Sequence, residues 1–223
     1  LVSSAASDVY KRQVYIIAEA GDQHFGSLDA AFELVDGAKY AGANCIKFQH
    51  HLPDEEMLPD VPMSSNFDQP LYEFLKENAL TIDQHRKVKN YCEKINIDYL
   101  CTPFSLKAAH ELITIGVEFF KIGSGEMTDT PTVSAIADMG LPMIVSTGMS
   151  TFDEIDRTYN LLIKKNIPIA LMNCTSEYPP IYEDINLKVI PLMQKRYPKA
   201  TIGHSDHTSD LVTSYGCLLY TSD

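Results

Sequence analysis

The chain has 223 residues, of which 45% are hydrophobic, and this suffices for one large domain or two small ones with a packed core. Its formal net charge of -12 argues against a nucleic-acid-binding or anionic-membrane surface. No apolar run reaches the length of a membrane span, the first residues lack the apolar core of a signal peptide, and the five cysteines lack metal-knuckle spacing. We therefore expect a soluble cytoplasmic protein with reduced cysteines.

Short apolar segments rich in β-branched and aromatic residues alternate with longer amphipathic segments along the chain. The apolar segments predict strands at residues 14–20, 44–49, 97–102, 119–123, 142–147, 168–174 and 200–206. The amphipathic segments, several with a Ser or Thr cap at their start, predict helices at residues 27–42, 81–95, 105–116, 130–140, 150–165 and 185–197.

Continuously apolar strands that alternate with helices indicate a parallel sheet covered by helices. About seven such strands favour an α/β fold of the (β/α)8 or TIM barrel class that is incomplete, with the last βα unit missing. No GxGxxG follows the first strand, which weakens the alternative of an open doubly wound dinucleotide-binding sheet. The polar, Pro-rich residues 50–80 are expected to form a βα loop on the face where barrels build their sites.

Both ends of the chain differ from this pattern. Residues 1–13 and 217–223 show neither helical nor strand periodicity, and they resemble translated sequencing adapters. We therefore expect them to be non-native or disordered tails, with a partial barrel domain at residues 14–216.

Polar residues follow the apolar run at nearly every predicted strand end. The residues include two lysines, several hydroxyls and backbone amides beside glycines, which are groups that bind a phosphate or a carboxylate. They also include two glutamates and a histidine, which are suited to proton transfer or metal binding. The carboxyl ends of barrel strands converge on one mouth, so these residues are candidates for a common site. They are Glu19, Lys47, Gln49, Thr102, Lys121, Ser124, Glu126, Ser146, Thr147, Asn173, Thr175, Ser176, Glu177, Tyr178, Ser205, Asp206, His207 and Thr208.

Taken singly, each of these residues has an ordinary structural explanation. A strand-end lysine usually extends to solvent, a Ser or Thr often caps the next helix, and His50 and His51 are expected to be solvated loop residues. The joint pattern leaves three interpretations open. They are an enzyme that binds a phosphorylated carboxylic acid and uses a metal on His207, a Schiff-base aldolase with Lys47 or Lys121 as nucleophile, and a non-catalytic anion-binding fragment.

Six ordered motifs resemble the N-acetylneuraminate (sialic acid) synthase family over residues 14–216. They are "IIAEAGDQHFGSLDAAFELVDGAKYAGANCIKFQ", "CTPF", "FKIGSGEMTD", "MIVSTGMSTFDEI", "CTSEYP" and "IGHSDHT". The resemblance implies a (β/α)8 barrel transferase that condenses phosphoenolpyruvate with an N-acetylated amino sugar. It also implies a divalent metal, Mn²⁺ or Mg²⁺, and a homodimer in the parent protein.

The resemblance also implies roles for individual residues. Glu19 and Glu126 would face the sugar or the reacting centre together with Tyr178, and His207 would be a metal ligand. The phosphoenolpyruvate site would be lined by Lys47, Thr102, Lys121, Ser124, Ser146, Ser176 and Ser205. The sugar could be N-acetylmannosamine, its phosphate or a diacetamido sugar. The alternative within this reaction class is a deoxy-heptulosonate phosphate synthase, which uses a cysteine metal ligand.

Three departures from the family pattern bear on activity. The motif "QHFG" carries Gln23 and Phe25 where the family has asparagines, and Ser176 stands where some members have asparagine. The family's second metal-binding histidine and its C-terminal antifreeze-like domain are both absent from this sequence. A single histidine is a poor metal site, so the chain alone is expected to be inactive.

Overall fold

The computed structural model describes residues 14–60 and 69–221. It divides into two compact units, one of Ile16–Ile122 with Asp138–Leu141, and one that holds Gly123–Ala137 and the chain from Pro142 onward. The predicted tail at 1–13 lies outside the described residues, as does part of the predicted loop at 50–80. The predicted tail at 217–223 overlaps helix α11 (Val212–Thr221), so secondary structure does not mark a boundary at Gly216.

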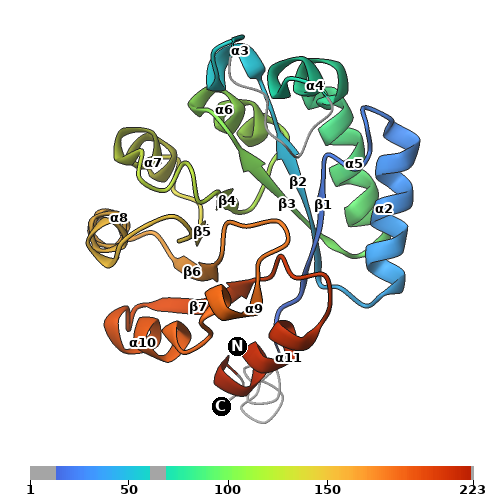
Figure 1. Cartoon of the computed structure of the whole chain (residues 1–223). Coiled ribbons are helices and arrows are strands. Elements are labelled where there is room, and N and C mark those ends of the chain that lie inside the picture. The colour runs from blue at the N-terminus through green and yellow to red at the C-terminus, as the bar shows by residue number, and fades with distance from the viewer. Residues whose placement is uncertain (1–13, 61–68, 222–223) are drawn as a thin grey trace, which may run out of the picture. The chain divides into compact units, whose positions relative to one another are not determined.

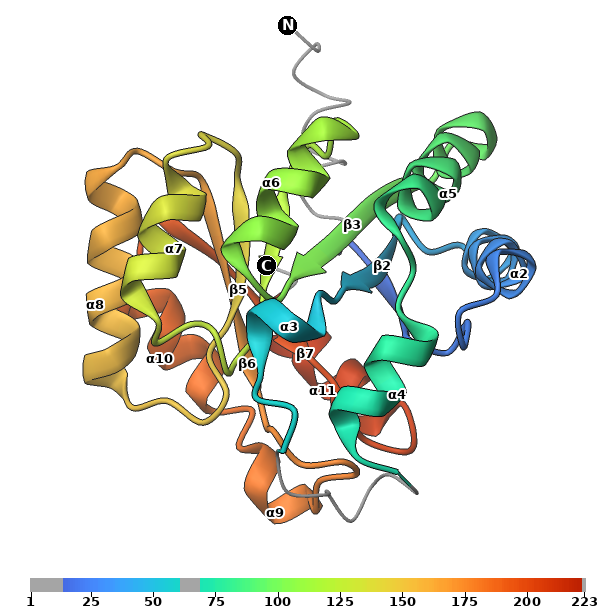
Figure 2. The ribbon, with the colours of Figure 1, turned by 90° about the horizontal axis from the view of Figure 1, so that it is seen from above.

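The first unit contains strands β1 to β4 with their helices (Figure 1). Strand β1 pairs with β2, β2 with β3, and β3 with β4, all in parallel. Helices α2 and α5 lie side by side, and the Tyr91 hydroxyl donates to Asp36 Oδ1 at 2.6 Å between them (Figure 2). The elements are β1 (Ile17–Gly21), α2 (Leu28–Tyr40), β2 (Cys45–His50), α3 (Pro53–Glu56), α4 (Leu71–Asn78), α5 (Ile82–Ile95), β3 (Asp98–Pro103), α6 (Leu106–Thr114) and β4 (Phe120–Ile122).

The second unit continues the same alternation of strand and helix. Strand β5 pairs in parallel with β6, and β6 with β7. The Thr158 hydroxyl donates to the Met127 carbonyl at 2.8 Å, and Arg196 donates to Asp156 Oδ1 at 2.9 Å, which joins α8 to α10. The elements are α7 (Thr130–Ala137), β5 (Met143–Ser146), α8 (Phe152–Lys164), β6 (Ile169–Cys174), α9 (Tyr182–Ile185), α10 (Val189–Arg196), β7 (Ala200–Ser205) and α11.

Every parallel pair given above joins strands that follow one another in the chain, which is the strand order of a (β/α)8 barrel. All seven predicted strands and all six predicted helices are present, with ends that differ by a few residues. The interpretation of residues 50–80 as a loop is wrong in part, because α3 and α4 form within this stretch. Helices α9 and α11 were also not predicted.

The strands form because their apolar side chains are buried on both faces. In β2, Cys45, Ile46 and Phe48 are buried, and in β3, Leu100 and Cys101 are equally inaccessible. Complete burial of a side chain such as Phe48 contributes about 1.5–3 kcal/mol. This double coverage explains why the strands appear in the sequence as continuous apolar runs.

Residues at the helix ends fix where the helices begin and stop. Ser27 and Ser105 cap α2 and α6, and capping boxes at Thr81 with Gln84 and at Thr151 with Glu154 begin α5 and α8. Among the described residues, no helix is long and apolar enough to cross a membrane. All five cysteines are free, as expected.

Candidate functional site

Glu19 and Lys47 are in register on the neighbouring strands β1 and β2, and their side chains form an ion pair. The Lys47 side chain is only 13% exposed. The other carboxylate oxygen of Glu19 accepts a hydrogen bond from the Gly21 amide at 2.9 Å. An ammonium group and a carboxylate are thereby held together at the carboxyl end of the sheet in the first unit.

Thr102 and Lys121 are further predicted site residues of the first unit. Thr102 is buried on β3 and is in register with Gln49 of β2. Lys121 is buried on β4, and its ammonium group donates to the Ile122 carbonyl at 2.8 Å. Lys121 therefore lies in the interior, whereas a lysine at a strand end usually extends into solvent.

In the second unit, Ser124 and Ser176 converge on Gly148. A Cβ atom at Gly148 would collide with Ser176 Oγ and would lie 2.8 Å from Ser124 Oγ and 3.1 Å from the Cys174 carbonyl. The glycine therefore lets two hydroxyls approach one stretch of backbone. Hydroxyl donors of this kind suit phosphate oxygens, which only accept hydrogen bonds. Gly148 was not among the predicted site residues, and its signal was its position two residues beyond Ser146 in "STGMS".

Two further predicted hydroxyls of this unit end strands on either side of β6. Ser146 ends β5 as a buried residue in register with Met172, and Ser205 ends β7 in register with Cys174. Glu126 follows β4 in the chain, and its carboxylate folds back against Gly123, where a Cβ atom would collide with it. Ser146 and Ser205 therefore lie at the same carboxyl end of this unit's strands.

His207 follows β7 and packs against Tyr178. Their rings stack with centroids 4.2 Å apart, and the Tyr178 hydroxyl lies 3.3 Å from His207 Nε2. His207 Nδ1 is 2.8 Å from the Thr175 carbonyl, which can only accept, so this nitrogen carries the proton. The hydrogen bond leaves Nε2 as the nitrogen with a lone pair, which is the state needed in a metal ligand.

The other donors of a metal site do not gather around His207. Within residues 14–60 and 69–221, no three His, Cys, Asp or Glu side chains form a group that could hold a metal ion. One imidazole falls short of the ligand number of a divalent metal site. The described residues therefore do not fit the implied Mn²⁺ or Mg²⁺ as a complete site.

The prediction that His50 and His51 are solvated is wrong, because both side chains are buried. His50 Nε2 lies 2.9 Å from Glu111 Oε2, and burial lowers the pKa of His50 despite this carboxylate. His51 contacts Gln49 and Glu56 and stacks on Phe104 with ring centroids 4.2 Å apart. Sequence reasoning missed this group because its acidic partners, Glu111 of α6 and Glu56 of α3, become neighbours only in the folded chain.

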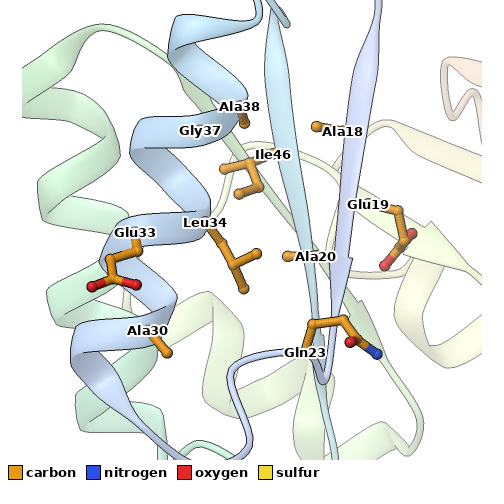
Figure 3. A pocket seen from close by; sticks show the side chains of 10 residues that line it. All are labelled: Ala18, Glu19, Ala20, Gln23, Ala30, Glu33, Leu34, Gly37, Ala38 and Ile46. Carbon is orange, nitrogen blue, oxygen red and sulfur yellow. The ribbon is translucent and has the colours of Figure 1, made fainter.

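A pocket of about 420 Å³ lies between α2 and the strands β1 and β2 of the first unit (Figure 3). Its lining is mostly small or aliphatic. In Figure 3, Ala18 and Ala20 project toward α2, whereas the carboxylate of Glu19 projects the other way. The pocket is therefore distinct from the place where Glu19 meets Lys47. Its lining residues are Ala18, Glu19, Ala20, Gln23, Ala30, Glu33, Leu34, Gly37, Ala38 and Ile46.

Comparison with known proteins gives a consistent result. The model of the NeuB family matches residues 34–220. N-acetylneuraminate-9-phosphate synthase of Drosophila melanogaster is 31% identical over 216 residues, covering 92% of this chain and 57% of that protein. N,N'-diacetyllegionaminic acid synthase of Campylobacter jejuni is 33% identical over 206 residues, covering 88% of this chain and 61% of that protein. The chain thus spans little more than half the length of these relatives.

A solved structure shares the fold. The crystal structure of N-acetylneuraminic acid (sialic acid) synthetase from Leptospira borgpetersenii, in complex with citrate, matches with a TM-score of 0.84 at 31% identity. The match covers 95% of this chain and 71% of that chain. Together with the parallel strand order, this confirms the predicted incomplete (β/α)8 barrel.

Proposed function

The chain belongs to the NeuB family, and from this premise we propose that it carries the barrel part of a sialic-acid-type synthase. The proposed reaction joins phosphoenolpyruvate to an N-acetylated amino sugar and releases phosphate. C3 of phosphoenolpyruvate forms a bond to the open-chain aldehyde carbon, water adds at C2, and the bond between C2 and the phosphate oxygen breaks. The products are a nonulosonic acid and inorganic phosphate.

The observation that carries this proposal is the convergence of Ser124 and Ser176 on Gly148. Phosphate oxygens are acceptors, so two adjacent hydroxyl donors favour their binding. Lys121 and Lys47 would add positive charge for the phosphate and carboxylate groups of phosphoenolpyruvate. Thr102, Ser146 and Ser205 would be further donors to this substrate.

The sugar side of the reaction is assigned to the two glutamates and Tyr178. Glu19 is held by Lys47 and the Gly21 amide, so its carboxylate has a fixed orientation. A carboxylate of fixed orientation suits binding of sugar hydroxyls and movement of the proton that the aldehyde oxygen gains. Glu126, held against Gly123, and Tyr178 would bind other polar groups of the sugar.

His207 is proposed as a metal ligand, and a bound Mn²⁺ or Mg²⁺ would polarise the aldehyde carbonyl. Its hydrogen bond to the Thr175 carbonyl supports a ligand role, because it fixes which nitrogen carries the proton. Since the described residues do not form a complete metal site, no step of the proposed reaction is assigned to a metal.

Phosphate release from phosphoenolpyruvate by the full-length protein tests this function. The assay supplies Mn²⁺ and compares N-acetylmannosamine, its phosphate and diacetamido hexoses. Release with one of these sugars names the substrate and supports the proposal. No release with any of them, from folded protein loaded with metal, would refute it.

A second measurement needs only this chain. The ³¹P resonance of phosphoenolpyruvate should broaden when the chain is added, and Ser124→Ala combined with Ser176→Ala should reduce the broadening. Unchanged broadening in the double variant would show that the anion binds elsewhere.

A further inference from the structure

His51 connects the loop after β1, the end of β2 and helix α3 in the first unit. It follows β2 directly, and in Figure 2 helix α3 lies beyond the end of that strand. Its Nδ1 is 3.0 Å from Glu56 Oε1 on α3, and its Nε2 is 2.9 Å from Gln49 Oε1. Asp22 Oδ2, from the loop after β1, lies 3.5 Å from Nε2. The side chains of His51 and Glu56 are only 6% and 4% exposed.

These contacts favour a doubly protonated ring, because a carboxylate lies near each ring nitrogen. Glu56 can only accept at Nδ1, and a positive ring balances the nearby carboxylate of Asp22. Burial by itself lowers the pKa of His51, but the hydrogen bonds and charges of Asp22 and Glu56 outweigh it and raise the pKa to about 9. His24 and His50 also face this group, and burial lowers the pKa of each of them. His51 is therefore the charged member of a buried histidine group at neutral pH.

A doubly protonated His51 determines which way the Gln49 amide points. Because Nε2 donates a proton, the amide oxygen of Gln49 must face His51, and the NH₂ group must face the other way. A Cβ atom placed at Gly21 would lie 3.8 Å from Gln49 Nε2 and 3.7 Å from Glu19 Oε1. The NH₂ group of Gln49 and the carboxylate of Glu19 therefore flank the same glycine.

We propose that His51 is a positioning residue for sugar recognition, which holds the Gln49 amide so that its NH₂ group is presented beside Glu19 to an acceptor oxygen of the sugar. The inference rests on the proposed function, because it takes the Glu19 side of the site as the sugar side. The matching acceptor on the sugar is the carbonyl oxygen of an N-acyl group or a hydroxyl oxygen. Gln49 would then contact the substrate, and His51 would act only through Gln49.

The charge of His51 sets the polarity of this contact. If His51 loses a proton while Glu56 still accepts from Nδ1, Nε2 becomes an acceptor, and the Gln49 amide is favoured in the flipped orientation. Gln49 would then offer its oxygen, and Glu19 beside it is also an acceptor. Two acceptors would face the acceptor oxygen of the sugar, so the sugar would bind more weakly.

The test uses the full-length protein and N-acetylmannosamine as the probe. His51→Asn should raise the KM or Kd for the sugar about tenfold, the loss of one well-placed hydrogen bond, and leave the KM for phosphoenolpyruvate unchanged. In a Gln49→Ala background, the same His51 substitution should have no further effect on sugar affinity. The matched control is Glu55→Gln, an exposed neighbour on α3 whose partner is Lys107 at 3.1 Å.

Folding and protonation are followed in parallel. Glu56→Gln is the second variant, because it removes one partner of His51 and leaves Gln49 intact, and ring ¹⁵N resonances report the protonation of His51. Both ring nitrogens should be protonated at neutral pH, and sugar affinity should fall as the pH rises through about 9.

Several results would overturn the proposal. The first is a neutral His51 ring at neutral pH. The second is an equal loss of affinity for both substrates in His51→Asn. The third is a loss of sugar affinity in the double variant that equals the sum of the losses in His51→Asn and Gln49→Ala. If the wild type binds the sugar and the variants bind it equally well, this inference is refuted and the proposed function is not. If the wild type binds no amino sugar, both the proposed function and this inference are refuted.

Discussion

Lys47 and Glu19 face each other across the parallel pair of β1 and β2, and their side chains form an ion pair. A lysine becomes a Schiff-base nucleophile when its surroundings favour the neutral amine. The carboxylate of Glu19 favours the charged ammonium instead. This contact therefore argues against the aldolase interpretation of Lys47.

Reductive trapping checks this interpretation. Borohydride added with pyruvate should give no covalent adduct at Lys47, because an ion-paired ammonium does not attack a carbonyl. Intact mass spectrometry followed by peptide mapping would detect the adduct. A stable adduct on Lys47 in the wild type that is absent from Lys47→Met would support the interpretation of the protein as a Schiff-base aldolase.

Removal of the Lys121 charge should weaken the binding of phosphoenolpyruvate and not that of the amino sugar. Lys121→Met keeps the buried aliphatic part of the side chain and should reduce phosphoenolpyruvate affinity about 10- to 100-fold, the effect of a lost charge-assisted hydrogen bond. Amino sugar affinity should change little. Titration followed by ³¹P NMR measures the first effect, and Lys87→Met on the exposed side of α5 is the control. Equal loss of both substrates would contradict the assignment of Lys121.

A methyl group at Gly148 should block the arrangement of hydroxyls. Gly148→Ala would press against Ser176 Oγ and Ser124 Oγ, so phosphoenolpyruvate affinity should fall at least tenfold. Gly125→Ala is the matched control, because a Cβ atom there meets nothing within 4 Å. Circular dichroism confirms that both variants fold. If Gly148→Ala bound phosphoenolpyruvate like Gly125→Ala, the phosphate could not lie at Gly148.

The charged His51 should make stability depend on pH in the weakly alkaline range. Its pKa is raised in the folded state to about 9 from an ordinary value of 6.5, so the folded state holds the proton more tightly than the unfolded chain. The resulting stabilisation is complete below about pH 6.5 and is lost as the pH rises through about 9, a change on the order of 3 kcal/mol.

Urea unfolding at a series of pH values between about 6 and 9 measures this dependence. Glu56→Gln should flatten the curve, because it removes one of the two carboxylates that raise the pKa of His51. A wild-type curve that is already flat over this range would show that His51 is neutral in the folded protein.

Metal binding by the chain alone should be weak. His207 offers one nitrogen, and the described residues supply no group of three donors. Titration of Mn²⁺ followed by electron paramagnetic resonance should show no saturable binding at micromolar metal, and His207→Ala should not change the result. Stoichiometric binding that disappears in His207→Ala would show that this chain assembles a site around His207 after all.

Local signals were sufficient to predict most of the fold. The strands are buried on both faces, so they appear as apolar runs, and Ser or Thr caps mark several helix starts. In residues 50–80 the prolines and acidic residues suggested a loop, although Tyr72, Leu75 and Leu80 are buried. The apolar spacing within "LYEFL" was the available signal for α4.

The positions of lysines and hydroxyls at strand ends were predictable for the same reason, since each follows its own strand in the sequence. The burial of His51 was not predictable, because it depends on Asp22 from the loop after β1 and on how α3 places Glu56 against the ring. A polar residue is buried only when partners satisfy it, and those partners become neighbours only in the folded chain. Gly148 was missed because its role lies in the space it leaves open.

The order of strand pairing has a consequence for how the chain acquires its structure. In each unit, a strand pairs with the next strand in the chain, although the paired residues can be far apart in sequence, as Cys45 of β2 and Asp98 of β3 are. The capping boxes of α5 and α8 use residues only three apart, so the first turn of each helix can form from local contacts. Both units can therefore grow by successive addition of strand and helix, including during synthesis at the ribosome.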